Sequence, residues 1–245
     1  MSQPAPNILQ SAMVLAAGRG ERMRPLTERL PKPLVPVAGR PLIDHVLDRL
    51  AAAGVERAVV NVHYLADQIE SHLRLRSNPQ ITISDERAAI LDTGGAVKKV
   101  LHLIGESPFF VHNSDSVWIE RQGSTIAKMG AAWDSETMDS LLLLAPVETS
   151  LGYSGRGDFS LGESGDIRRR QQGETVPHVF AGVSINKPSL FAGAPEGAFS
   201  INRNWDQALE AGRLAAIVHE GSWMHVGTPA ALADAERRLD GLHAA

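Results

Sequence analysis

A short segment near the N-terminus gathers cations around a glycine turn. An apolar run, residues 12–15, leads into Gly18 and Gly20, which leave backbone N–H groups free to face an anion. The cations of this segment are Arg19, Arg22, Arg24, Arg29 and Lys32. A strand, a glycine turn and fixed positive charges favour a polyphosphate ligand, because a purely structural loop would need only the glycines. The spacing matches neither a Walker loop nor the three-glycine dinucleotide fingerprint.

The same segment resembles a known signature. Residues 15–27 nearly reproduce Leu-Ala-(Ala/Gly)-Gly-x-Gly-x-Arg-(Leu/Met)-x-Pro-Leu-Thr, and residues 31–34 read Pro-Lys-Pro-Leu, as in the sugar-1-phosphate nucleotidylyltransferases. The resemblance implies an enzyme in which Arg22 contacts a nucleoside triphosphate and Lys32 contacts the phosphates at the reaction centre. The alternative for Arg22 is a solvated loop arginine. Further nucleotide contacts are implied for Ala16, Ala17, Gly18 and Gly20.

The implied reaction is attack of a sugar phosphate oxygen on the α-phosphorus of a nucleoside triphosphate, with pyrophosphate leaving. The sugar phosphate is already ionised at neutral pH, so catalysis needs positioning and charge stabilisation rather than a strong general base. Arg22 can hold two phosphate oxygens at once, whereas Lys32, between two prolines, presents a point charge. Arg19 and Arg24 are expected either to contact phosphate or only to line the rim.

Two positions are expected to bind metal. Residues 113–115, Asn-Ser-Asp, follow an apolar strand and resemble the family's Asn-Gly-Asp turn, whose aspartate holds the catalytic Mg²⁺. The alternative for Asp115 is a carboxylate that caps the following turn. His225 stands where the family segment Trp-x-Asp-(Val/Ile/Thr)-Gly-Thr-Pro has its aspartate. Because imidazole suits Mn²⁺ better than Mg²⁺, His225 is a second metal ligand, a phosphate contact or a packing residue.

The remaining candidates surround the base, ribose and sugar. Residues 91–96 resemble the family segment against base and ribose, and Thr93 and Gly94 are its expected contacts. Gly94 and Gly95, which open a helix, are expected to allow close backbone approach and leave free N–H groups, and Asp92 or Thr93 would also cap that helix. The run Arg168–Arg170 is either a solvated face or a contact to the sugar phosphate or a substrate carboxylate, since the Glu-Lys-Pro segment of many relatives is missing. The candidates for the sugar phosphate are Asn113, Gly182, Arg168 and Arg203.

Within the family, the chain most resembles the N-acetylmuramate-1-phosphate uridylyltransferases of peptidoglycan recycling, which use UTP. The compact length, the Asp-Thr-Gly-Gly segment and the lack of hexapeptide repeats carry this resemblance. The expected function is therefore uridylyl transfer to that sugar 1-phosphate, giving a nucleotide sugar and pyrophosphate. Mannose-1-phosphate guanylyltransferase and glucose-1-phosphate uridylyl- or thymidylyltransferase are alternatives. A non-catalytic nucleotide-sugar sensor is favoured by His225 but opposed by the retained Arg22, Lys32 and Asp115.

The amino-acid composition limits the kinds of binding partner that are expected. The 245 residues carry a net charge of −4, which argues against general nucleic-acid binding, so small-molecule substrates are expected. There is no cysteine, which excludes disulfides and thiolate chemistry. Residues 1–10 lack the pattern of a signal peptide, and apolar runs such as 141–146 are too short to span a membrane. A cytoplasmic location without membrane association is expected.

The elements that position these residues alternate between strand and helix. Strands are expected at 12–16, 55–62, 81–83, 109–112, 140–147, 179–185 and 214–219. Helices are expected at 41–50, 66–75, 94–104, 124–133, 200–211 and 229–239, and glycines at 152–165 predict loops and a hairpin. The pattern predicts a doubly wound, mostly parallel mixed α/β sheet flanked by helices, with ligands beyond the carboxyl ends of its strands. One domain is expected over 1–245: a loose extension (1–10), a nucleotide-binding half (about 11–120) and a sugar-binding half (about 121–245).

Overall fold

The computed structural model describes residues 9–162 and 165–243; the expected N-terminal extension therefore lies mostly outside the described residues. The main strands are β1 (Ser11–Leu15), β4 (Arg57–Val62), β5 (Gln80–Asp85), β6 (Phe109–Asn113), β8 (Ser140–Pro146), β9 (Phe159–Leu161), β10 (Ile167–Arg169), β11 (His178–Asn186) and β12 (Leu214–Val218). The helices are α1 (Leu42–Ala52), α2 (Ala66–Leu73), α3 (Asp92–Ile104), α4 (Thr125–Ala132), α5 (Asn202–Glu210) and α6 (Pro229–His243).

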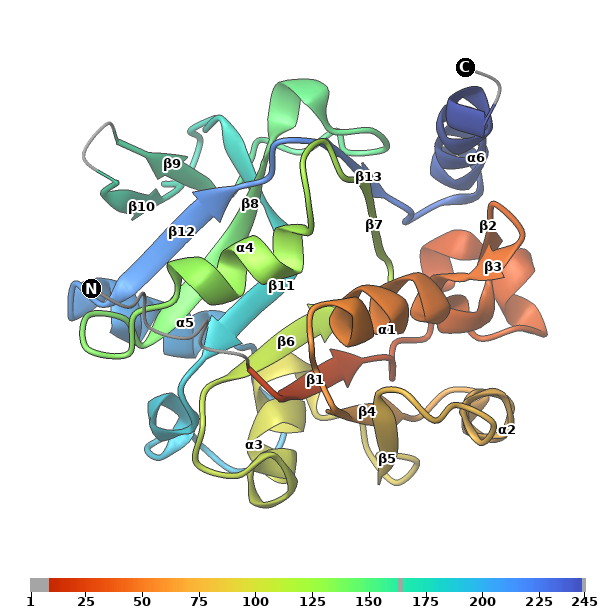
Figure 1. Cartoon of the computed structure of the whole chain (residues 1–245), viewed down its shortest axis with the longest axis horizontal. Coiled ribbons are helices and arrows are strands. Elements are labelled where there is room, and N and C mark those ends of the chain that lie inside the picture. The colour runs from red at the N-terminus through yellow and green to blue at the C-terminus, as the bar shows by residue number, and fades with distance from the viewer. Residues whose placement is uncertain (1–8, 163–164, 244–245) are drawn as a thin grey trace, which may run out of the picture.

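These nine strands form one central sheet (Figure 1). Its order is β10-β9-β11-β6-β1-β4-β5; β8 pairs with β11 near both of its ends, and β12 pairs with β8. Strands β10 and β11 run opposite to the rest, so the sheet is mixed and mostly parallel, and that prediction is confirmed. Two short antiparallel pairs lie outside it: β2 (Pro36–Val37) with β3 (Arg40–Pro41), and β7 (Ser116–Ile119) with β13 (Ser222–His225).

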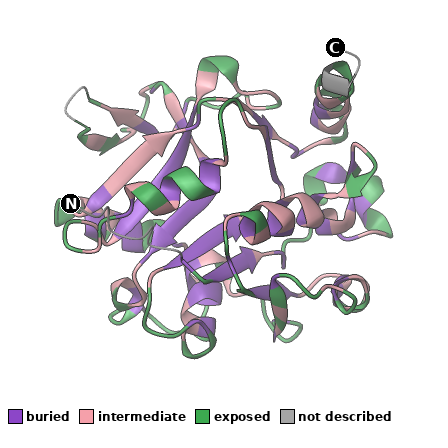
Figure 2. Ribbon diagram, viewed as in Figure 1, coloured by how far each residue is buried: buried purple, intermediate pink, exposed green. Residues whose placement is uncertain are grey.

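Successive side chains of each strand point to opposite faces of the sheet, so they contribute to two hydrophobic cores, one on each face. Ala12 and Val14 of β1 pack with α1, α2 and α4, whereas Met13 faces α3 and α5. Figure 2 shows the central strands buried between these helix layers. A third, smaller core joins α6 to β7, β13 and the segment after β1, and Met23 and Met224 lie within it. A sheet covered on both faces explains why its strands read as nearly continuous apolar runs.

The parallel register places the ends of three strands side by side. Leu15, the last residue of β1, is level with Asn61 of β4 and Asn113 of β6. The segments that follow these strands therefore emerge at one edge, as expected for an open α/β sheet. The loop after β1 and residues 113–115 therefore lie at the same edge, where the Ser114 N–H donates to the Leu15 carbonyl at 3.1 Å.

The sequence located the long elements to within a few residues but missed the short ones. Strands β7 and β13 were not expected; they are four-residue strands that pair across about one hundred residues of chain, which local pattern does not reveal. The loop after β1 also contains three short 3₁₀ helices: Glu21–Met23, Leu26–Glu28 and Lys32–Leu34. The hairpin expected within 152–165 lies slightly later, as β9 and β10. Among the described residues, none of the helices has the length and apolarity to cross a membrane.

Candidate active site

The loop after β1 folds back on itself at Gly20. This residue has a φ of +64°, and a Cβ there would lie 2.9 Å from Lys32 Cβ and 3.0 Å from Thr27 Cγ2. The Thr27 hydroxyl donates a hydrogen bond of 2.8 Å to the Gly20 carbonyl. Glycine therefore supplies both the left-handed backbone and the close approach that bring the start of the loop against Lys32.

Lys32 and Asp115 form an ion pair at the centre of the edge. The Lys32 Nζ donates to Asp115 Oδ2, and the two side chains are only 12% and 24% exposed. Burial alone would raise the pKa of the Asp115 carboxyl, but the charge and hydrogen bond of Lys32 outweigh it and lower that pKa below its usual value. Asp115 is therefore a carboxylate at neutral pH, held by a fixed cation.

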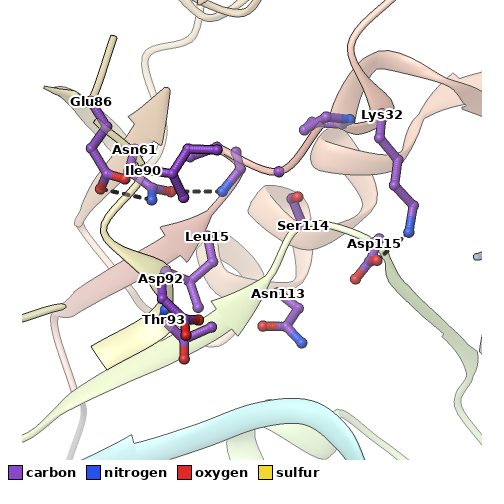
Figure 3. A pocket seen from close by; sticks show the side chains of 14 residues that line it. Leu15, Lys32, Asn61, Glu86, Ile90, Asp92, Thr93, Asn113, Ser114 and Asp115 are labelled. Atoms are coloured by element: carbon purple, nitrogen blue, oxygen red, sulfur yellow. Dashed lines mark hydrogen bonds and ion pairs between the residues drawn. The ribbon is translucent and has the colours of Figure 1, made fainter. Parts of the chain in front are cut away.

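A cavity of about 260 Å³, here called the edge cavity, opens beside this pair (Figure 3). Its lining comes from the ends of β1, β4 and β6, from the segments that follow β1, β5 and β6, and from the start of α3. The lining residues are Leu15, Ala16, Ala17, Gly18, Lys32, Pro33, Asn61, Glu86, Ile90, Asp92, Thr93, Asn113, Ser114 and Asp115. The structure thus brings Ala16, Ala17, Gly18, Thr93 and Asn113 together with Lys32 and Asp115, as sequence analysis predicted for a ligand-binding edge.

Two buried polar residues of this cavity were missed by sequence analysis. The Ala16 N–H donates to Asn61 Oδ1 at 2.7 Å, and Asn61 Nδ2 donates to Glu86 Oε1 at 2.9 Å. The Leu91 N–H donates to Glu86 Oε2 at 3.3 Å. Asn61 is 3% exposed and Glu86 2% exposed. An asparagine near the end of an otherwise apolar strand was the available signal for Asn61, whereas nothing in the local pattern distinguishes Glu86 from a surface glutamate.

The glycines that open α3 do not leave free N–H groups, contrary to expectation. Gly94 and Gly95 donate to the Phe199 carbonyl at 2.8 and 3.1 Å. A Cβ on Gly94 would lie 2.3 Å from the Phe199 ring, so this glycine permits close packing rather than ligand approach. The N-cap residue is Leu91, which has no side-chain cap. Of the two predicted capping residues, Asp92 accepts a first-turn N–H, from Thr93 to its Oδ1 at 2.6 Å, whereas the Thr93 hydroxyl accepts from the Ile201 N–H at 2.9 Å.

A second cavity, the loop cavity, has a volume of about 390 Å³ and also has the ion pair in its lining. It is lined by Gly18, Arg19, Gly20, Glu21, Arg22, Lys32, Asp115 and Gly227. Arg22 and Arg19 are exposed there, ready to meet an anion, whereas Arg24 and Arg29 are not part of this lining. Lys32, Asp115 and Gly18 line both cavities, so the edge cavity and the loop cavity adjoin at the ion pair.

His225 approaches the same pair from β13. Its strand pairs with β7 so that His225 is level with Ser116, the residue after Asp115. Burial lowers the pKa of His225, the Asp115 charge partly opposes this, and the cations Lys32 and Arg22 lower it further. The imidazole is therefore neutral at neutral pH, which is the form that ligates metal.

The donors present fit a divalent cation that takes most of its ligands from substrate. Within residues 9–162 and 165–243 there is no group of three or more His, Asp or Glu side chains arranged around a metal position. Asp115 and His225, the two candidate ligands from sequence analysis, are consistent with such a site. Mg²⁺ and Mn²⁺ in nucleotide enzymes commonly use one or two protein ligands together with phosphates and water.

A further compartment, the hairpin cavity, has a volume of about 250 Å³ and adjoins the edge cavity. It is lined by Leu15, Asp92, Thr93, Val111, Asn113, Asp158, Phe159, Arg169, Phe180, Ser200, Ile201, Asn202 and Trp205. Four of these residues, Leu15, Asp92, Thr93 and Asn113, also line the edge cavity. The described lining includes Arg169 but none of the other basic candidates.

The structure places three sugar-phosphate candidates away from these linings. Arg168 is exposed and pairs with Glu174, with its Nη1 2.8 Å from Oε2, on the strand face opposite to Arg169. Arg203 is exposed at the start of α5. Gly182 is buried in β11 with a φ of +88°, and a Cβ there would lie 2.0 Å from Ser116 Oγ. Of the predicted set, Asn113 alone lines the hairpin cavity within the described residues.

This arrangement defines a class of enzyme. A doubly wound sheet, a cation-rich glycine loop and an ion pair between two adjoining cavities together suit transfer between a nucleotide and a phosphorylated second substrate. Comparison with known proteins agrees: residues 11–156 match the nucleotidyl transferase family model. The chain belongs to the nucleotidyl transferase family, so the predicted membership is confirmed.

Two curated relatives are similar over nearly the whole chain. The N-acetylmuramate alpha-1-phosphate uridylyltransferase of Caulobacter vibrioides is 52% identical, with 98% of this chain and 99% of the relative covered. The protein of the same name from Neisseria meningitidis serogroup B is 37% identical, with 92% and 96% covered. A solved UDP-glucose pyrophosphorylase complexed with UDP-glucose shares the fold at a TM-score of 0.75 and 17% identity, over 95% of this chain and 99% of that one.

Proposed function

We propose that this enzyme transfers uridylyl from UTP to N-acetylmuramate α-1-phosphate, releasing pyrophosphate. Two relatives that carry this name and align along nearly their full lengths support the substrate assignment. The single structural observation behind the site assignment is the Lys32–Asp115 pair, because it is common to the edge cavity and the loop cavity. A reaction centre must touch both the α-phosphate and the leaving pyrophosphate, and this pair stands where both can reach it.

Each side chain has a role that follows from its place. The nucleoside occupies the edge cavity against Ala16, Ala17 and Thr93, and the pyrophosphate portion lies in the loop cavity beside Arg22. Lys32 neutralises charge that develops on the phosphates in the transition state, which is the main catalytic requirement of such a transfer. The sugar portion extends into the hairpin cavity past Asn113, so that its phosphate oxygen faces the α-phosphorus from that side.

A divalent cation fits beside Asp115, with His225 as its second candidate ligand. When bound, such an ion neutralises phosphate charge and helps to orient the triphosphate. Asp115 contributes a carboxylate kept ionised by Lys32, and His225 contributes a neutral imidazole. A carboxylate is a suitable ligand for Mg²⁺, whereas an imidazole ligand favours binding of Mn²⁺ at this site.

We further propose that the chain divides at about residue 120 into a nucleotide-binding half and a sugar-binding half of a single domain. The edge and loop cavities draw almost all their lining from residues before that point, and the hairpin cavity draws most of its lining from residues after it. We place the reaction in the cytoplasm, where UTP is available.

The test is pyrophosphate release from UTP, GTP, CTP and dTTP with a panel of sugar 1-phosphates that includes N-acetylmuramate 1-phosphate, each with Mg²⁺ and with Mn²⁺. Turnover with UTP and N-acetylmuramate 1-phosphate well above every other pair is the expected result. Preference for GTP with mannose 1-phosphate would replace the substrates and keep the mechanism. Nucleotide binding without turnover of any pair would contradict the proposed enzyme and favour a sensor.

A further inference from the structure

The hairpin cavity contains one cation in a position that the proposed reaction does not use. Of the described residues that line this cavity, Arg169 alone carries a positive charge. Lys32 and Asp115, where the reacting phosphate must lie, line the edge cavity and not this one. Arg169 therefore meets a part of the ligand other than the reacting phosphate.

The Arg169 guanidinium is held in place before any ligand arrives. Its Nε lies 2.6 Å from Asp206 Oδ1, and its Nη1 lies 3.4 Å from Asn202 Oδ1. The guanidinium carbon also lies 4.8 Å from the centre of the Phe159 ring, at cation–π distance. Three neighbours from the hairpin and α5 thus fix one edge and one face of the group, so little conformational freedom remains to be lost on binding.

Two donors of this group lack hydrogen-bond partners. Arg169 Nε and Nη2 are buried and make no hydrogen bond of acceptable geometry among the described residues, although Nε lies at ion-pair distance from Asp206. A buried donor without a partner is costly, and a charged donor more so, which makes an acceptor from the ligand the natural completion of the group. Because Asp206 is about half exposed, water screens its charge and leaves Arg169 able to attract a second anion.

We propose that Arg169 recognises a carboxylate on the sugar, and that it selects sugar 1-phosphates bearing this second negative charge. The inference rests on the proposed function: the lactyl ether of N-acetylmuramate supplies such a carboxylate, and N-acetylglucosamine lacks it. Charge-assisted hydrogen bonds from arginine to a carboxylate are among the stronger polar contacts in proteins. Asp158, whose Oδ2 accepts from the Phe180 N–H at 3.0 Å, lines the same cavity and disfavours anions elsewhere on the sugar.

The experiment compares N-acetylmuramate 1-phosphate with its lactamide analogue, which has nearly the same shape without the charge. The wild-type enzyme is expected to prefer the acid by about 10- to 100-fold in kcat/KM. Arg169→Gln should reduce kcat/KM for the acid by about that factor through KM, and should change the value for the amide by less than about threefold. Arg169→Lys, which keeps the charge but not the planar fork, should restore part of the preference.

A matched control comes from Arg156, an exposed arginine of the same lobe whose Nη1 lies 3.5 Å from the Gly173 carbonyl. Arg156→Gln removes the same charge away from the three cavities and should leave the acid–amide ratio unchanged. Thermal unfolding and UTP binding of each variant show whether it is folded.

Several outcomes would overturn the inference. Equal losses on acid and amide in Arg169→Gln would place Arg169 on the sugar ring or phosphate. An unchanged preference would remove it from recognition altogether, and loss of the preference in Arg168→Gln or Arg203→Gln would move the contact to another arginine. If the wild-type enzyme does not use N-acetylmuramate 1-phosphate, the proposed function and this inference fail together. If it does and Arg169→Gln keeps the preference, the inference alone fails.

Discussion

The cavities that we propose for the nucleotide (edge and loop cavities, the nucleotide side) and for the sugar (hairpin cavity, the sugar side) are built from different kinds of structure. On the nucleotide side, residues follow the carboxyl ends of adjacent parallel strands, and the level register of Leu15 with Asn61 and Asn113 sets their spacing. On the sugar side, the lining comes from the antiparallel β9–β10 hairpin, from β11 and from the start of α5. The first side is a regular edge, and the second is assembled from separate segments.

This difference predicts how substitutions act. A side chain at the end of a paired parallel strand can change without disturbing the backbone, so the nucleotide side should respond mainly in catalysis and nucleotide affinity. The sugar side depends on where β11 bends away from one neighbour and joins another, so it should respond in stability and in substrate selection. The predictions below test that division, from the largest expected effect to the smallest.

The strongest test of the nucleotide side is Lys32→Met. Removing the charge between the edge and loop cavities should lower kcat by about 10²- to 10³-fold, since fixed donors at developing phosphate charge have effects of this size. Nucleotide KM should change much less, and circular dichroism should be unchanged. Steady-state pyrophosphate release with UTP measures the loss.

Lys128→Met provides the control, because Lys128 is an exposed lysine whose Nζ lies 2.5 Å from Glu220 Oε2, away from the cleft. It should keep activity within about twofold, as expected for a surface pair. A Lys32→Met enzyme with nearly normal kcat would show that the ion pair is not at the reaction centre.

Gly182→Ala tests the sugar side through stability. Gly182 lies within the register shift of β11, where the strand passes from β9 to β6, with a φ of +88° and Ser116 Oγ 2.0 Å from a built Cβ. The backbone strain and the clash together should reduce the free energy of unfolding by about 2–4 kcal/mol. Urea denaturation measures the change.

Two comparisons separate strain from clash. Gly39 has a similar φ of +73°, but a Cβ at this position would have no atom within 4 Å. Gly39→Ala should therefore lower the free energy of unfolding by only about 1 kcal/mol. Adding Ser116→Gly to Gly182→Ala should recover the part due to the clash. Equal costs for Gly182→Ala and Gly39→Ala would mean that the packing against Ser116 does not hold the two sides together.

The same division explains what the sequence could predict. The long strands and helices were found because each has its own periodic pattern, and the loop residues near Lys32 were found because they form one contiguous signature. Glu86 was missed since its burial depends on Asn61, which lies 25 residues earlier. The run Arg168–Arg170 was a candidate as a whole, because the arginine that lines the hairpin cavity depends on the pairing of β10 with β9, which composition does not determine. Contacts between segments that are far apart in the sequence therefore could not be predicted from the sequence.

Glu86→Gln returns to the nucleotide side with a smaller effect. Both carboxylate oxygens accept hydrogen bonds, from Asn61 Nδ2 and from the Leu91 N–H. A glutamine side chain has one NH₂ group in place of an oxygen, so this NH₂ group would face one of the two donors. The cost, about 1–2 kcal/mol, should appear as a roughly tenfold weaker affinity for UTP with little change in kcat. Titration calorimetry with UTP measures it.

Glu56→Gln, in the segment just before β4, serves as its control because Glu56 is exposed and its Oε1 accepts only a long 3.4 Å bond from Gln10 among the described residues. It should leave UTP affinity unchanged. If Glu86→Gln bound UTP normally, the buried Asn61–Glu86 network would be structural support for β4 rather than part of the nucleotide site.

The smallest effect concerns His225, which reaches the nucleotide side from β13 rather than from the central sheet. If His225 ligates the metal, His225→Asp replaces an imidazole by an oxygen donor and should raise the ratio of Mg²⁺- to Mn²⁺-supported kcat about 3- to 10-fold. Mn²⁺ binding in the presence of UTP, followed by electron paramagnetic resonance, should weaken relative to the wild type. His102→Asp, on the exposed face of α3, should change neither quantity. An unchanged metal ratio in His225→Asp would make His225 a packing or phosphate-contacting residue. The β7–β13 pair would then support Asp115 without completing the nucleotide side, which would consist of the parallel edge and its loop alone.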